Sequence, residues 1–164
     1  MTTQRRGPAV IEFPSELEIV ITREFAAPRQ LVFDVLTKPE HVRKTMSPFG
    51  ERVKVCEIDL RVGGKYHFVF VTDSGFECSF RGTFLTVEPP LRTVQTWLFE
   101  GWPDAEAVET HELHETDGVT TLTYKLAFRD KVGRARMTKF DGPQANLDHV
   151  ETLLLSLLDQ PSRH

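Results

Sequence analysis

The chain has 164 residues, of which 40% are hydrophobic and 27% are charged, and its net charge is −4. This length and apolar content suit one domain with a real core, which excludes global disorder. The acidic balance is not that of a nucleic-acid binder, and no apolar run approaches the ~20 residues of a membrane span.

The first residues carry glycine and prolines without any periodicity. We therefore expect residues 1–15 to form a mobile N-terminal tail and residues 16–160 to form a single domain. The two arginines near the start are not followed by an apolar stretch, so no secretory signal is expected and the cytoplasm is the expected compartment. Neither Cys56 nor Cys78 fits a metal or redox spacing, and both are expected to be free thiols on non-adjacent strands.

The β-branched, apolar segment Glu18–Phe25 predicts a strand. A helix is predicted over 28–36, because proline suits its first turn and apolar residues recur in it at helical spacing. Pro39 can begin a second short helix, with Val42 and Met46 facing inward.

Between residues 53 and 128, short runs rich in valine, threonine and phenylalanine are separated by turn sequences. The turns at Gly63-Gly64 and Asp117-Gly118 are typical of β-hairpins, and the close spacing predicts an antiparallel meander. The predicted strands are Val53–Leu60, Lys65–Thr72, Glu77–Glu88, Arg92–Glu100, Ala107–Glu115 and Val119–Phe128.

The last segment returns to helical spacing and is strongly apolar, which predicts a long helix packed on the sheet. Its inward stripe is Leu147, Val150, Leu154 and Leu157, widened by Leu153, Leu155 and Leu158. The predicted fold class is therefore α+β. A curved antiparallel sheet wraps around the long C-terminal helix, and two short helices follow the first strand and close one end.

Aromatic side chains share one face on several predicted strands, and the chain contains twelve phenylalanines. A sheet that bends around one helix can leave open volume, so these rings predict an apolar cavity; a filled core is the alternative. Polar groups inside it, such as Thr93, Gln95, His111 or Tyr124, would orient a ligand. The predicted ligand-binding residues are Met46 and Phe49 near the mouth, then Phe68, Phe70, Phe84, Gln95, Trp97, Phe99, His111, Leu147, Val150 and Leu154.

Four stretches in this order match a known superfamily. They are REFAAPRQLVFDVLTKPEHV (23–42), EIDLRVGGKYHFVF (57–70), FRGTFLTVEPPLRTVQTW (80–97) and GVTTLTYKL (118–126). Together they resemble the START-like (SRPBCC) superfamily, and more narrowly its heat-shock-protein-90 ATPase-activator-like branch. The resemblance covers about 18–158 and implies the helix-grip fold. It implies no single function, because the superfamily includes lipid carriers, cyclases, allergens and chaperone cofactors. The tryptophan-rich segment that the branch often has after its second helix is replaced here by 43–50, which contains no tryptophan.

No nucleophile motif, phosphate-binding loop or metalloprotease motif occurs in the chain. His111 and His114 are three residues apart on a predicted strand and face opposite sides, so no metal site is expected there. No cofactor is expected either. An inward His111 could orient a ligand or act as a general base. Asp59 is expected to pair with Arg61, although an Asp59–His67 pair across the hairpin is a second candidate.

We expect the protein to bind an apolar or amphipathic small molecule between the sheet and the C-terminal helix, without catalysis. The first alternative is a chaperone-cofactor-type protein-interaction module. The second is a cyclase- or hydrolase-type enzyme that uses a histidine or an acid in the cavity. The ligand itself is not identified by the sequence, and neither a nucleic acid nor a membrane span is expected.

Charged residues are unevenly distributed between residues 100 and 139. Residues 100–117 include seven acidic residues and no lysine or arginine, whereas residues 130–139 include four basic residues and one acidic residue. Two copies could pair through these segments in a weak homodimer. Surface charges are screened within about 8 Å at physiological salt, so the dimer should dissociate as salt is added. Sedimentation velocity at low and high salt tests this, and a monomer under both conditions would contradict it.

Overall fold

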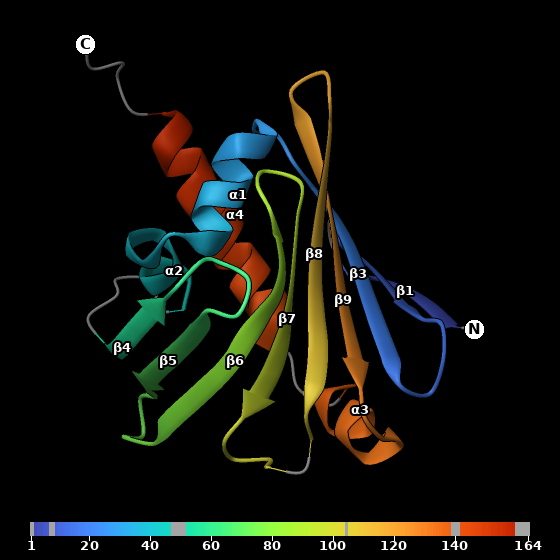
Figure 1. Ribbon diagram of the computed structural model, residues 1–164. Helices are drawn as coiled ribbons and strands as arrows, with labels where there is room; N and C mark the ends of the chain where they lie inside the picture. The colour runs from blue at the N-terminus through green and yellow to red at the C-terminus, as the bar shows by residue number, and fades with distance from the viewer. Residues whose placement is uncertain (1, 7–8, 47–51, 104, 139–141, 160–164) are drawn as a thin grey trace.

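The computed structural model describes residues 2–6, 9–46, 52–103, 105–138 and 142–159 (Figure 1). The strands are β1 (Thr2–Arg6), β2 (Ala9–Phe13), β3 (Glu18–Phe25), β4 (Val53–Ile58), β5 (Lys65–Val71), β6 (Glu77–Glu88), β7 (Arg92–Phe99), β8 (Ala107–Thr116) and β9 (Val119–Phe128). The helices are α1 (Arg29–Thr37), α2 (Pro39–Met46), α3 (Lys131–Thr138) and α4 (Gly142–Leu158).

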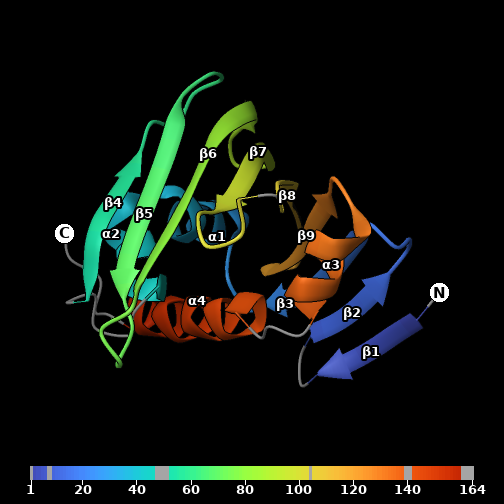
Figure 2. The same cartoon turned by 90° about the horizontal axis from the view of Figure 1, so that it is seen from below.

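All the described strands belong to one antiparallel sheet. Their spatial order is β1-β2-β3-β9-β8-β7-β6-β5-β4, so β9 pairs directly with β3 although the two are far apart in the chain. The sheet curves, and α4 runs across its open side with α1 and α2 packed against it (Figure 2). The predicted α+β helix-grip fold is therefore confirmed.

The core lies where α1 and α4 meet the strands around β9. Strand β9 alternates strictly between buried and partly exposed residues, as expected for a strand that covers a core on one face. Its Leu122 and Leu126 are fully buried, and they belong to one cluster with Phe25 of β3, Val32 of α1 and Val150 of α4. The helix stripe that faces the sheet thus fills this half of the concave side.

The expectation of a mobile tail over 1–15 is corrected by the structure. Strand β1 pairs with β2, and β2 pairs with β3, where Ile11 lies opposite Ile21. Ala9 and Ile11 are buried in the core. The sequence did not indicate these strands because the segment is short and is flanked by prolines. Physically, the pairing covers an edge of β3 that would otherwise present unpaired backbone groups.

Two further differences concern helices. Helix α3 was not predicted, because its sequence is mostly polar and has Gly133 at its centre; that glycine lies against Phe128 and Ala105, which leaves no room for a side chain. On α4, the apolar stripe is narrower than predicted, because Leu155 and Leu158 are exposed.

The cysteines are placed as expected. Cys56 lies on β4 and Cys78 on β6, with β5 between them, and both are free. Burial raises the pKa of each thiol, which lowers its reactivity. Among the described residues, no helix combines the length and the apolar character needed to cross a membrane.

One buried arginine ties α4 to the sheet. Arg23 on β3 is only 2% exposed, and its guanidinium donates to Asp148 Oδ1 at 2.7 Å and to Glu151 Oε1 at 3.1 Å. It also lies 5.4 Å from the centre of the Phe25 ring. Because both carboxylates belong to α4, these ion pairs fix the position of that helix across β3.

We expect Arg23→Ala to lower the free energy of unfolding by about 1–3 kcal/mol, because it removes two charge-assisted hydrogen bonds and the packing of the aliphatic stem. Urea denaturation measures this change. The control is Lys125→Ala, which breaks a more exposed pair with Glu18 and should cost less than about 1 kcal/mol. Equal losses for the two variants would contradict a special role for Arg23.

Candidate functional site

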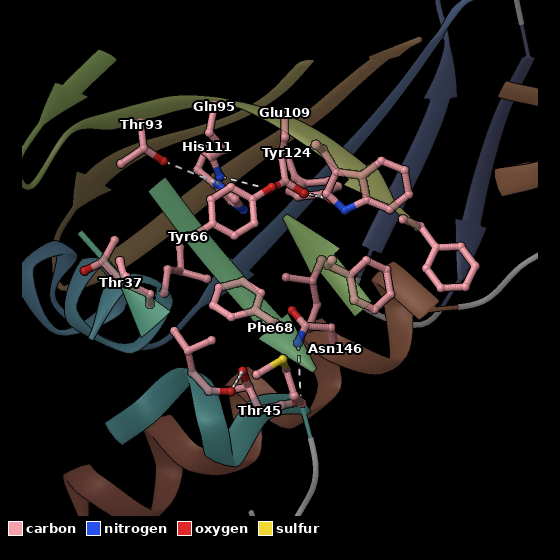
Figure 3. A pocket seen from close by; sticks show the side chains of 18 of the residues that line it. Thr37, Thr45, Tyr66, Phe68, Thr93, Gln95, Glu109, His111, Tyr124 and Asn146 are labelled. Atoms are coloured by element: carbon pink, nitrogen blue, oxygen red, sulfur yellow. Dashed lines mark hydrogen bonds between the residues drawn. The ribbon is translucent and has the colours of Figure 1, made fainter. Parts of the chain in front are cut away.

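A cavity of about 350 Å³ lies between the sheet and the helices (Figure 3). This volume falls within the range of roughly 300–1,000 Å³ that is usual for small-molecule sites. Its lining comes from strands β4 to β9 and from all four helices.

Aromatic rings form most of its wall. Phe80 lies 5.0 Å from Phe99 and 5.9 Å from Trp97 between ring centroids, and Tyr66 lies 5.0 Å from Phe68. Such ring pairs contribute roughly 0.5–1.5 kcal/mol beyond their buried area. The rings face the same way because antiparallel pairing sets Phe68 opposite Phe80 and residues two apart share a face. The lining aromatics are Tyr66, Phe68, Phe70, Phe80, Phe84, Trp97, Phe99, Trp102 and Tyr124.

A glycine determines how one of these rings sits. Gly82 lies opposite Tyr66 in the pairing of β5 with β6, and a Cβ at this position would collide with the Tyr66 ring and with the carbonyl oxygen of Thr96. The missing side chain lets the Tyr66 hydroxyl donate to Thr96 O at 2.7 Å. Any larger residue here would collide with the backbone of β7 as well as with the ring.

The sheet wall of the cavity also carries a buried polar cluster. Glu109 on β8 accepts a hydrogen bond from Gln95 Nε2 at 2.9 Å and a second, short one from the Tyr124 hydroxyl. Three adjacent strands, β7, β8 and β9, contribute these residues, because Gln95 pairs with Glu109 in the β7–β8 register. Figure 3 shows the cluster pointing into the cavity.

His111 extends this cluster along β8. Its Nδ1 lies 3.4 Å from both Gln95 Nε2 and Thr93 Oγ1, and its ring lies 4.9 Å from that of Tyr124. Both neighbours can donate to Nδ1, which places the imidazole proton on Nε2. His111 therefore takes part in the network as a neutral ring.

Burial controls the protonation of these groups. Desolvation lowers the pKa of His111, and the opposing effect of the Glu109 carboxylate is smaller. Desolvation followed by the charge of Glu109 raises the pKa of Tyr124 well above its usual value, and the same two causes raise the pKa of Tyr66. Both phenols keep their protons at neutral pH, so Tyr124 acts as a hydrogen-bond donor.

The helix wall has polar groups that already have partners. Asn146 Nδ2 donates to Thr45 O at 3.3 Å, and His149 Nδ1 lies 2.8 Å from the same oxygen. The Thr45 hydroxyl donates to Val42 O at 2.9 Å. These contacts join α2 to α4 and leave the sheet wall as the side with polar groups available to a ligand.

Most of the predicted site residues line this cavity. They are Met46, Phe68, Phe70, Phe84, Gln95, Trp97, Phe99, His111 and Leu147. Val150 and Leu154 do not; they are buried in the core cluster beside it, together with Leu147. Phe49 lies outside the described residues. Contact of any of these side chains with a ligand stays a prediction.

Sequence reasoning missed several lining residues. Glu109 shares a strand face with His111, so the alternation of β8 could have identified it. Trp102 follows β7 and packs edge-on against Phe99 at 5.1 Å between centroids. Met137 comes from the helix that was not predicted, so nothing in the strand pattern could have placed it in the cavity.

The other histidine candidates lie away from the cavity. His114 is exposed on the opposite face of β8 and lies 3.2 Å from the Thr116 hydroxyl. His67 Nε2 lies 3.0 Å from Ser79 Oγ. Both carboxylate oxygens of Asp59 accept a hydrogen bond from Arg61 Nε, Oδ1 at 3.0 Å and Oδ2 at 2.9 Å. The expected pairing of Asp59 with Arg61 is therefore confirmed.

Solved structures share this fold. A protein from Rhodobacter sphaeroides is 21% identical with a TM-score of 0.79, and the match covers 90% of this chain and 97% of that one. A protein from Mycobacterium smegmatis is 19% identical with a TM-score of 0.78, covering 99% and 100%. A protein from Chromobacterium violaceum is 26% identical with a TM-score of 0.70, covering 84% and 96%.

A search of curated proteins finds no match. A family model described as activator of Hsp90 ATPase homolog 1-like protein matches residues 26–154. The matched segment includes α1, α2, the strands from β4 to β9 and most of α4. The chain therefore belongs to the activator of Hsp90 ATPase homolog 1-like family, as the resemblance implied.

Proposed function

We propose that this protein binds an amphipathic, largely apolar small molecule in the cavity between the sheet and the helices. The observation that carries the proposal is a volume of about 350 Å³ with an aromatic wall and one buried polar cluster. Apolar ligand surface removed from water favours binding by about 25 cal/mol per Å² before the cost of association. The polar cluster would fix the orientation of the ligand.

The family description supports a second candidate, activation of the ATPase of a chaperone. A protein-interaction module would stimulate ATP hydrolysis when added to Hsp90, and it would do so with its cavity blocked. A binder of small molecules would leave the ATPase rate unchanged. Comparing the ATPase rate with the parent protein and with a cavity-blocked variant separates the two functions.

An enzyme would use the same polar cluster differently. Glu109 and His111 are the groups that could act as acid or base on a bound substrate. The proposal is binding without turnover, so a bound compound should be recovered unchanged. Mass spectrometry of the compound after prolonged incubation tests this, and conversion to a product would favour the enzyme.

The cytoplasm is the compartment that we propose for this function. Two free thiols, on strands that are not neighbours, suit a reducing compartment. Thiol titration of freshly purified, denatured protein should find both Cys56 and Cys78 reactive.

The variant Cys78→Trp should fill the cavity. Cys78 lies opposite Phe70 in the β5–β6 pairing and lines the cavity, so an indole at this position would occupy open volume. We expect it to abolish binding of the neutral, environment-sensitive dye Nile red while changing the free energy of unfolding by less than about 1 kcal/mol. In a filled core the same substitution would cost roughly 1–3 kcal/mol through overpacking.

The matched control is Arg81→Trp, which adds the same side chain to the same strand on its exposed, opposite face. It should leave dye binding unchanged. Fluorescence titration and urea denaturation of the two variants and the parent give both quantities. A parent protein that binds no dye, together with a strongly destabilised Cys78→Trp, would leave the filled-core interpretation.

A further inference from the structure

The chemical class of the ligand can be inferred from the charge of the cavity; this inference rests on the proposed function. Among the described residues that line the cavity, Glu109 is the only one of the types Asp, Glu, Lys and Arg. It is 9% exposed, and no ion pair within the described part of the chain includes it. An isolated buried carboxylate is costly unless a positive charge or several donors compensate it.

The described residues that contact Glu109 supply hydrogen bonds but no positive charge. Gln95 and Tyr124 are neutral donors. His111 is the nearest group that could become a cation, and burial lowers its pKa, so it stays neutral at neutral pH. His149 lies at the helix wall, where its Nδ1 donates to Thr45 O and not to Glu109.

A second acceptor without a partner lies beside the carboxylate. Gln95 is 6% exposed, and its Oε1 is buried with no hydrogen-bond donor among the described residues. The amide cannot be turned round, because Oε1 would then face the Glu109 oxygen that Nε2 now contacts at 2.9 Å. The two atoms of one amide are about 2.2 Å apart, so Oε1 lies within roughly 5 Å of that carboxylate oxygen.

One nitrogen placed between two acceptors at this separation can reach both of them. A protonated primary or secondary amine has at least two N–H donors and carries a positive charge, which no described lysine or arginine brings to this lining. A carboxylate or phosphate would meet the charge of Glu109 instead, and a neutral hydroxyl would leave that charge uncompensated. The rest of the cavity is aromatic and offers no further charge among its described residues.

We propose that the ligand is an amphipathic cation, in which a primary or secondary ammonium group is joined to an apolar body that fits among aromatic rings. The ammonium donates to the Glu109 carboxylate and to Gln95 Oε1. The apolar body lies against Phe68, Phe80 and Trp97. Glu109 thereby selects the charge of the ligand, and the aromatic wall selects its shape.

Three probes that share one naphthalene body test this assignment: 2-naphthylmethylammonium, 2-naphthylmethanol and 2-naphthoate. Displacement of Nile red from the parent protein gives their affinities at fixed pH and moderate salt. The ammonium should bind at least about tenfold more tightly than the alcohol, because a hydrogen bond to an ionised partner is the stronger one. The naphthoate should bind most weakly.

The variant Glu109→Gln keeps the shape and polarity of the side chain and removes its charge. It should abolish the preference for the ammonium while the affinity for the alcohol stays within about threefold. The matched control is Glu112→Gln, the same change on the same strand, where the side chain is exposed on the opposite face. This control should keep the full preference. Thermal unfolding confirms that each variant is folded.

Two kinds of failure are distinguishable. If neither Nile red nor any of the probes binds to the parent protein, the proposed function is overturned together with the inference. If the dye binds and is displaced equally by the ammonium and the alcohol, or best by the naphthoate, the cavity binds ligands but is not a site for cations. A preference for the ammonium that survives in Glu109→Gln would also overturn the assignment.

Discussion

The architecture depends on how one helix fills the concave side of a wide, curved sheet. Helix α4 lies against β3 and β9, where Arg23 holds it through Asp148 and Glu151. Its Val150 is fully buried on this side, whereas Leu147 borders the open volume towards the other strands. A single helix about 10 Å wide cannot cover nine strands. The sheet's curvature therefore creates both a packed half and a hollow half from one continuous apolar face.

The open cavity changes how strongly its polar residues interact with a charged molecule. In water, the Glu109 carboxylate and its neighbours would interact weakly with any charged molecule. Surrounded by aromatic rings, the same groups act in a medium of lower effective dielectric, where each charge and each unsatisfied acceptor has a larger effect. The β7–β8–β9 register places Gln95, Glu109 and Tyr124 side by side, so the sheet both preorganises the cluster and isolates it from solvent.

The regular alternation of side chains along a strand explains which elements could be predicted from the sequence. Strands such as Glu77–Glu88 and Val119–Phe128 were predicted with the observed bounds, because side-chain period and turn residues specify them locally. The direction of α4 relative to β3 was not predictable, since it depends on a contact between residues more than a hundred positions apart. That direction decides that Leu147 borders the cavity and Leu154 does not. Helix α3 and its Met137 were missed because a polar helix with a central glycine has no apolar period.

The N-terminal strands determine which part of the chain is needed to complete the core. The segment that matches the family begins at residue 26, after β1, β2 and β3. A fragment cut at that boundary would lose Arg23, Phe25 and the whole of β3, which pairs with one edge of β9. Its β9 would become a free edge able to recruit strands from other molecules. The segment that matches the family model therefore lacks a strand that the core of this chain needs. Fragments of this chain should retain at least β3.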